Sequence, residues 1–558
     1  MEEKYKIHII NFLLFIVIII SANVIASQFF YQWDLTEEKR HTLSDQSKIL
    51  LKQINKEVFI EVFLEGDLPP GFDRLQKSVK QILDEFRQYS GANIQYSFID
   101  PNSGKNEAER SRYFMQLAKR GLQPTNLHAS ENGKQSEKII FPGAIITYKG
   151  KEVPVQLLTG NQGSSPSEML NQSVEALEYQ FVSAFKKVVA SSDVRIGFTE
   201  GHGELSNEEI DDIARSLKET YQVERINPSA ISNLNDYYDI LIFAKPTRFF
   251  NDDDKLKIDQ FIIKGGKAIF FLDKTNASME GYDPNQSVIT DMNLNLDDML
   301  FKYGVRLNST IVKDMQCSAI PMVVGMLGDK PQNQLVPWMY YPILTRFGTH
   351  VSVKNMSAVI SKFTGSIDTI KVQGIQKIPL IYTSQYSKEQ TIPFKIELEE
   401  AKKQLGPDDF NKSQIPVAYL LIGQFKSLYT NRLSAEKQRE TGFEEKSRSS
   451  KIMVFADGDI IRNEVSPDKS QAYPLGFDKY LRKKFANKEL IQNCIDYMAD
   501  ENGIIQARSR QIKLRPLDKQ KAKKDRLYWQ TINIAFPLIL LIGFGIFYFI
   551  YYKKRYAS

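Results

Sequence analysis

The sequence predicts an α/β protein whose folded part lies between two membrane-spanning helices. Three observations lead to this fold class. Short apolar strands alternate with amphipathic helices through the middle of the chain. Uncharged apolar segments occupy residues 9–26 and 532–552, and each is long enough to cross a bilayer. The composition, with 42% apolar and 25% charged residues in a chain of 558, is that of globular domains.

Residues 35–190 predict the first α/β domain. The alternating strand EVFIEVFLEG leads through a proline–glycine turn into the amphipathic helix RLQKSVKQILDEFRQYSG. These are followed by the strand NIQYSFIDP, a helix over residues 107–121, the two strands of IIFPGAIITYKGKEVPVQLL and the helix SVEALEYQFVSAFKKVV. The order β-α-β-α-β-β-α is that of a thioredoxin-like domain. The position where such a domain carries its redox CxxC motif reads PPGF, so we expect no thiol chemistry.

Residues 191–507 predict the second α/β domain. Strands and helices alternate from DVRIGFTE through YDILIFAKP to KAIFFLD, and this alternation predicts a doubly wound parallel sheet of the flavodoxin-like kind. The apolar strands IPVAYLLIGQF and SKIMVF are expected to continue the same sheet. Residues 427–450 between them are polar and lack periodicity, which predicts a mobile loop. Residues 508–531 are expected to form a basic linker into the second span.

Charge, cysteines and missing motifs exclude several classes of function. The net charge of +6 is small and the charges are mixed, so no nucleic-acid groove is indicated. Cys317 and Cys494 form no CxxC or zinc pattern; two buried thiols are favoured, although spacing does not exclude a disulfide. No GxxxxGK[ST] motif occurs, and neither cysteine stands on a strand-to-helix elbow of the amidotransferase kind. We therefore expect no enzyme, no cofactor and no metal.

The two spans set the expected membrane orientation. The short tails, residues 1–8 and 553–558, are expected in the cytoplasm, because a long domain translocates largely regardless of loop charge. Residues 24–26 also fit a signal-peptide cleavage site, but an uncleaved anchor is favoured. Asn11 and Asn533 are polar residues within the spans, where they would hydrogen-bond to partner helices or lie near the interface.

The stretch RIGFTEGHGELSNEEID contains the first candidate site: Glu200, Gly201, His202, Gly203 and Glu204. The glycines fit a turn with positive φ at the carboxyl end of a strand, where α/β folds bind ligands. A metal would need further converging ligands, and an acid–base pair would need a nucleophile. We therefore favour a structural turn, or a contact surface made from it, over a catalytic site.

The stretch FADGDIIRNE contains the second candidate turn, Asp457, Gly458 and Asp459. Paired carboxylates can bind calcium or magnesium, but no EF-type loop follows, and an Asp-Gly turn at a strand end is the favoured interpretation. The aromatic run WMYYP, residues 338–342, is compatible with a ligand platform and is more typical of a core or an interface.

Several separate motifs in the same order make the chain resemble one family, the gliding-motility-associated ABC transporter auxiliary subunit GldG of Bacteroidetes. These motifs are YQWDLTEEKRHTLSDQS, FTEGHGEL, WMYYPIL, VSVKNMSAVISKFTGSIDTI, GQFKSLYTNR, VFADGDIIRNE and NCIDYMADENGIIQARSRQIKLRPLD. The resemblance covers nearly the whole chain.

The resemblance implies a non-enzymatic subunit anchored in the inner membrane with its bulk in the periplasm. In this family the subunit works with a multi-span permease and a cytoplasmic ATPase, and the complex is linked to gliding motility. The resemblance also implies that the second domain is amidotransferase-like and intraflagellar-transport-like without the catalytic cysteine. Relatives also occur in bacteria that do not glide.

Two further hypotheses compete with an accessory subunit that acts by protein–protein interaction. One is a membrane-tethered protein that binds a peptide or glycan at the carboxyl edge of the sheet. The other is a hydrolase that uses His202 with neighbouring acids. A chain with small cytoplasmic tails and no nucleotide motif has no means of coupling ATP by itself, which favours the accessory subunit.

Overall fold

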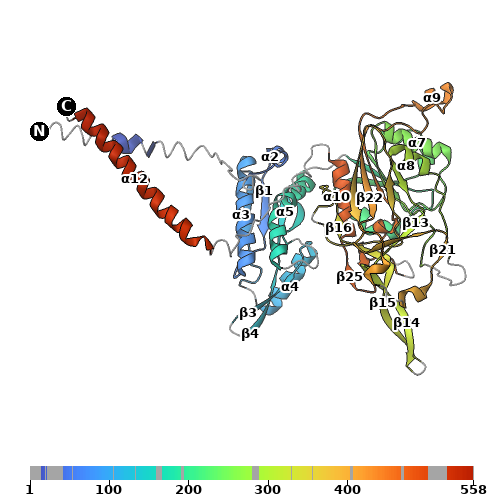
Figure 1. The fold of residues 1–558 in the computed structure, drawn as a ribbon, viewed down its shortest axis with the longest axis horizontal. Helices are drawn as coiled ribbons and strands as arrows, with labels where there is room; N and C mark the ends of the chain where they lie inside the picture. Colours follow the sequence, from blue (N-terminus) through green and yellow to red (C-terminus); the bar gives the residue numbers. More distant parts are fainter. Residues whose placement is uncertain are drawn as a thin grey trace. The chain divides into compact units, whose positions relative to one another are not determined.

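The computed structural model divides the chain into two compact units, residues 1–510 and 511–558 (Figure 1). It describes residues 14–18, 20–21, 42–52, 54–104, 106–131, 134–158, 166–189, 194–279, 288–327, 330–354, 356–402, 406–466, 471–500 and 524–556.

The first α/β region is built on a four-stranded sheet in the order β2-β1-β5-β6. Strand β1 pairs in parallel with β2 and antiparallel with β5. Its elements in chain order are α2 (Asp45–Lys52), β1 (Val58–Val62), α3 (Pro70–Tyr89), β2 (Ile94–Phe98), α4 (Glu107–Lys119), β3 (Thr125–Glu131), β4 (Lys134–Ile140), β5 (Gly143–Tyr148), β6 (Lys151–Gln156) and α5 (Pro166–Val189).

Helices cover both faces of this sheet. Phe86 of α3 packs edge-to-face on Phe181 and Phe185 of α5, in the same buried cluster as alternate residues of β1. Leu117 of α4 belongs to a separate cluster with Ile145 of β5. The predicted elements are present, and α3 begins four residues earlier than predicted because Pro70 fits the first turn of a helix. The β3–β4 hairpin was not predicted.

The second α/β region is built on an eight-stranded sheet whose first five strands are parallel. The last three pair antiparallel, a change of direction that the sequence pattern did not predict. In sheet order the strands are β8 (Gln222–Ile226), β7 (Arg195–Thr199), β9 (Ile240–Ala244), β10 (Lys267–Phe271), β23 (Ser450–Phe455), β22 (Pro416–Gly423), β19 (Ile375–Tyr382) and β16 (Arg346–Phe347).

This sheet has an apolar cluster on each face, because successive side chains of a strand point to opposite sides. Ile240 and Ile242 of β9 join one cluster, whereas Leu241 and Phe243 join the other. Helices α6 (Asn207–Lys218) and α10 (Asn487–Ala499) contribute to the first cluster, and α7 (Asp252–Ile263) and α8 (Asp297–Tyr303) contribute to the second.

A long insertion separates β10 from β23, and its main feature is the hairpin of β14 (Cys317–Leu327) and β15 (Lys330–Leu344), which extends away from the sheet (Figure 1). Trp338 and Tyr340 at the base of β15 are buried in a core cluster, so these two residues of WMYYP are core residues. Short strands complete the region: β11 (Val288–Ile289), β12 (Val305–Leu307), β13 (Thr310–Asp314), β17 (Val359–Ile360), β18 (Ile367–Thr369), β20 (Ser387–Thr391), β21 (Phe394–Lys395), β24 (Phe477–Asp478) and β25 (Lys483–Lys484). Strand β11 pairs with β21, β12 with β18, β13 with β20, β24 with β25, and β17 with β15.

Residues 427–450, predicted as a mobile loop, contain the short helix α9 (Ala435–Thr441), which starts at the N-cap Ser434. The segment is also fastened at its beginning, where the buried Ser427 hydroxyl donates to Asp259 of α7 at 2.6 Å. The sequence pattern did not predict this helix, because the segment is polar and is held by contacts with residues far away in the sequence.

Helix α12 (Arg526–Tyr556) is, among the described residues, the one helix long and apolar enough to cross a membrane. It contains Asn533 and begins within the segment predicted as linker. Of the predicted first span, residues 14–18 and 20–21 are helical. The rest of that span, Asn11, the first tail and most of the predicted linker lie outside the described residues.

Candidate functional site

The carboxyl ends of the parallel strands meet at one edge of the sheet and gather both predicted turns there. Residues 200–204 follow β7, and residues 457–459 follow β23 after Ala456. Between them, Lys245 follows β9 and Asp273 follows β10. This edge is where open α/β sheets place their ligands.

The first turn has the backbone that its glycines predict. Gly201 and Gly203 have φ of 110° and 74°, in the left-handed region. A Cβ on Gly203 would lie 2.3 Å from the Thr247 Oγ1 atom, so only glycine fits there. The N–H groups of Thr247 and Arg248 donate to the His202 carbonyl oxygen at 2.9 and 2.8 Å. The turn is therefore fastened to the loop that follows β9.

The His202 ring is buried, with 5% of the residue exposed, and it lies flat on Phe250 with ring centroids 3.8 Å apart. Its Nε2 atom is 3.2 Å from Asp254 Oδ2, and its Nδ1 atom is 3.7 Å from Glu204 Oε1. Asp254 Oδ2 also accepts from the Ser229 hydroxyl at 2.7 Å. The ring thus joins the turn to the first turn of α7. Burial between two carboxylates suits this fastening role.

Glu200 has a different environment. Its side chain is 48% exposed and pairs with Arg225 at 2.9 Å. Of the five residues predicted for this turn, it offers the most accessible charged group to a partner. The structure therefore separates the turn into a buried fastening part, His202 and Glu204, and an exposed carboxylate, Glu200.

Glu204 gives the turn a pH dependence. Burial raises the pKa of its carboxyl, but its interactions with His202, including the hydrogen bond that Glu204 Oε2 accepts from the His202 N–H at 2.7 Å, outweigh burial and hold the pKa below its ordinary value of 4.5. A carboxyl with a depressed pKa in the folded state adds stability above its ordinary pKa and loses that stability as pH falls through the folded pKa. Glu204→Gln should therefore cost about 1–2 kcal/mol near neutral pH.

The measurement is the thermal midpoint of both proteins over a pH series. The difference between them should shrink as pH falls below 4.5. Glu200→Gln, in the same turn but exposed, serves as the control with a small effect. A difference between wild type and Glu204→Gln that is constant over the series would contradict this account.

The second turn is part of a buried charge network. Lys245 Nζ lies 2.6 Å from Asp459 Oδ2 and 3.2 Å from Asp273 Oδ2. Asp273 Oδ1 accepts the Gly458 N–H at 2.6 Å, and Asp457 accepts the N–H groups of Asp459 and Lys362 at 2.7 and 2.8 Å. One ammonium group thus links the ends of β9, β10 and β23.

The network shifts the pKa values of its members in opposite directions. Burial lowers the pKa of Lys245, but the charges of Asp273 and Asp459 outweigh burial and raise it. Burial and the charges of Asp459 and Asp273 raise the pKa of Asp457 well above its ordinary value. Burial acts in the same direction on Asp459, but Lys245, Lys362 and Arg462 outweigh it and lower its pKa. Lys245 and Asp459 therefore form the charged pair at the centre.

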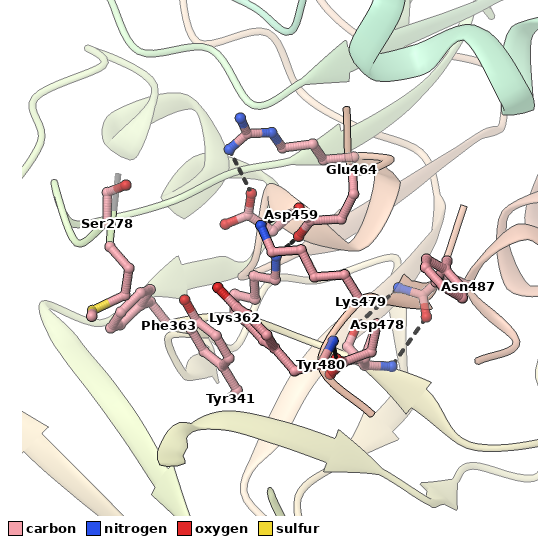
Figure 2. Close-up of a pocket in the computed structure, with 15 residues that line it drawn as sticks. Ser278, Tyr341, Lys362, Phe363, Asp459, Glu464, Asp478, Lys479, Tyr480 and Asn487 are labelled. Carbon is pink, nitrogen blue, oxygen red and sulfur yellow. Dashed lines mark hydrogen bonds and ion pairs between the residues drawn. The ribbon is translucent and has the colours of Figure 1, made fainter. Parts of the chain in front are cut away.

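A pocket of about 160 Å³ opens beside Asp459 (Figure 2). Aromatic side chains of Tyr341, Phe363 and Tyr480 line it together with Lys362, Glu464 and Lys479. Glu464 accepts from Lys362 and lies 3.4 Å from Lys479 Nζ. The Asp459 Oδ1 atom is buried and, within the described part of the chain, accepts no hydrogen bond, but Arg462 Nη1 lies 3.5 Å from it in an ion pair. A ligand that donates to this oxygen would therefore share the carboxylate with Arg462.

Sequence reasoning missed Lys245, Asp273 and Lys362. The sequence did carry a signal for the first two residues. Lys245 comes directly after the buried apolar strand β9, and Asp273 is separated by one residue from the end of the buried apolar strand β10. Lys362 carried no such signal, since it lies in the insertion. Among the described residues, no group of three or more His, Cys, Asp or Glu side chains has the arrangement to hold a metal ion.

Neither Cys317 nor Cys494 forms a disulfide. Cys494 is buried in α10, whereas Cys317 is partly exposed at the start of β14. Burial, with the charge of Asp314, raises the pKa of the Cys317 thiol to about 12. The Cys317 thiol is therefore not activated as a nucleophile at neutral pH.

Comparison with known proteins matches two family models to this chain and finds, among others, one similar curated protein and one similar solved structure. Residues 37–147 match a domain of unknown function (DUF7088). An uncharacterized protein of Borreliella burgdorferi is 22% identical over 418 residues, 72% of this chain and 75% of the relative. The solved mmIFT52 N-terminal domain is 13% identical with a TM-score of 0.30, over 55% of this chain and 96% of that one. Residues 193–494, more than half of the chain, match the family described as an ABC-type uncharacterized transport system, and the chain therefore belongs to this family of ABC transport auxiliary proteins.

Proposed function

We propose that the chain is a non-catalytic, membrane-anchored subunit of an ABC transporter-type complex that acts by contacts with a multi-span permease and a cytoplasmic ATPase. The observation that carries the proposal is the family match over residues 193–494, in a chain that also holds the apolar helix α12. The proposed placement is the inner membrane with two spans, both termini cytoplasmic and the bulk periplasmic. A link to gliding motility rests on the resemblance to the GldG family.

The geometry of the candidate site supports a subunit without its own chemistry. His202 is buried between two carboxylates and stacked on Phe250, so it lacks access to a substrate. The sequence has no phosphate-binding motif. Energy from ATP would therefore reach this chain through neighbouring subunits.

The strand orders support the finer fold assignments that we propose. The order β2-β1-β5-β6, with β5 antiparallel to β1, supports a thioredoxin-like first domain. The five parallel strands lie in the sheet order β8-β7-β9-β10-β23. Numbered by their occurrence along the chain, this order is 2-1-3-4-5, as in flavodoxin-like and related amidotransferase-like sheets. We propose boundaries at residues 35–190 and 191–507 for the two domains.

We infer that the β14–β15 hairpin is a contact with the permease. Between Cys317 and Thr345 the only charged residues are Asp329 and Lys330, in a chain with 25% charged residues. On the outer face Val323 is 50% exposed and Leu335 is 44% exposed. Depletion of charge around exposed apolar residues is typical of the centre of a protein interface.

The double variant Val323→Glu/Leu335→Glu tests this contact. Both side chains are half exposed, so the fold should remain stable, whereas two carboxylates buried without partners in an interface should weaken binding at least tenfold. Affinity purification from native membranes measures the amount of permease recovered. Tyr237→Glu/Phe301→Glu, at 57% and 49% exposure elsewhere, is the matched control. Equal recovery with both variants would place the contact elsewhere.

A membrane-tethered protein that binds a peptide or glycan is the second candidate. The pocket beside Asp459 favours it, because aromatic walls and a buried carboxylate oxygen that accepts no hydrogen bond among the described residues suit a ligand with N–H or O–H groups. The presence or absence of complex partners separates the two candidates.

A further inference from the structure

A basic loop joins β24 to β25 next to the pocket. Residues 479–484 read KYLRKK, and all six are exposed. Lys479 pairs with Glu464 at 3.4 Å. Within the described ranges, no carboxylate lies within 4 Å of the charged groups of Arg482, Lys483 and Lys484, although Lys483 Nζ lies 5.2 Å from the centroid of the Phe485 ring and the charge of Lys484 acts on Asp212. All three cations are exposed to solvent.

Two side chains with exposed apolar surface belong to the same loop, and one of them, Tyr480, also borders the pocket beside Asp459. Tyr480 is 39% exposed and Leu481 is 36% exposed. Cations alone would suit any polyanion. An aromatic and an aliphatic side chain flanked by cations suit a bilayer interface, where charged headgroups cover the apolar acyl chains.

The loop holds its shape without a partner. Asp478 Oδ1 accepts the N–H groups of Tyr480 and Leu481 at 2.8 and 3.0 Å, and Asp478 Oδ2 accepts the Ser318 hydroxyl at 2.5 Å. Arg482 takes a left-handed conformation, with φ of 49°. Because the backbone is already ordered, little conformational entropy would be lost on binding.

We propose that this loop docks on the anionic surface of the bilayer in which the chain is anchored. Arg482, Lys483 and Lys484 would contact anionic headgroups, while Tyr480 and Leu481 enter the interface. The inference rests on the proposed anchoring by α12. The 25 residues from 501 to 525, between the second domain and α12, have a fully extended length of at most about 90 Å. Tethering also raises the effective concentration of the bilayer surface.

The test uses the full-length chain with Tyr480→Trp, reconstituted into vesicles that contain brominated lipids. One vesicle set is phosphatidylcholine, and the other is an equimolar mixture of phosphatidylcholine and phosphatidylglycerol. Each basic residue near an anionic surface favours the bound state about fivefold, so three shift the equilibrium roughly a hundredfold. The added tryptophan should therefore be strongly quenched in the anionic vesicles and weakly in the neutral ones, after subtraction of the wild-type signal.

Two charge variants in the Tyr480→Trp background complete the design. Arg482→Gln/Lys483→Gln/Lys484→Gln should abolish the difference between the vesicle sets. Lys302→Gln/Lys371→Gln/Lys446→Gln removes the same charge from exposed positions elsewhere and should preserve the difference. Equal quenching in both vesicle sets, or a difference between the sets that persists in the loop variant, would overturn the docking proposal. A chain that fails to float with either vesicle set would instead contradict the anchor itself.

Discussion

Replacing Lys245 by methionine is expected to lower the free energy of unfolding by about 3–5 kcal/mol, because it leaves buried carboxylates without their countercharge. Asp273 and Asp459 lie 3.2 and 2.6 Å from the Lys245 ammonium and are almost inaccessible to water. Methionine keeps the length of the side chain, so packing changes little. Chemical denaturation of the full-length protein in detergent, followed by circular dichroism, measures the loss.

Lys402→Met provides the matched control for this loss. Lys402 pairs with Glu399 at 3.0 Å, but both side chains are largely exposed, and such pairs contribute about 0–1 kcal/mol. If Lys245→Met were no more destabilising than Lys402→Met, the network at the carboxyl edge would not hold the ends of the strands together as described.

Replacing His202 by alanine is expected to cost about 2–4 kcal/mol, the second-largest effect. The variant removes a buried ring stacked on Phe250 and leaves the buried Asp254 without one of its partners. Thermal and chemical denaturation measure the change. Glu200→Ala, in the same turn, should cost less than about 1 kcal/mol because its ion pair is exposed.

The His202 variant also separates a fastening role from chemistry. A residue that fastens the turn lowers stability when removed, whereas a catalytic residue abolishes a reaction while the fold keeps its stability. A stable His202→Ala protein that loses function would therefore contradict the role assigned here. Loss of partner binding in a stable Glu200→Ala protein would instead identify the exposed part of the turn as a contact.

The central strands were predictable from the sequence for a physical reason. A parallel strand covered by helices on both faces is apolar throughout, as in ILIFA of β9, where all five residues are buried. The β14–β15 hairpin lacked a comparable signal. All five residues of WMYYP are buried, so the base of the hairpin shows no alternation of buried and exposed residues. The outer part of the hairpin exposes proline, leucine and glutamine side chains.

The positions of the two candidate turns were predictable, but their partners were not. Positive φ at Gly201 and Gly203 follows from local sequence. In contrast, His202 meets Asp254, 52 residues later, and Lys245 meets Asp459, 214 residues later. The order and register of parallel strands set these contacts, and neither can be read from spacing along the chain.

The most direct measurement is gentle solubilisation of the full-length chain from its native membrane, followed by identification and quantification of the proteins that co-purify. The account predicts a multi-span permease and an ATPase with a phosphate-binding motif, each in a fixed ratio to this chain. Recovery of the intact chain alone would contradict a role as a complex subunit, and would favour a tethered protein that binds its ligand in the pocket beside Asp459.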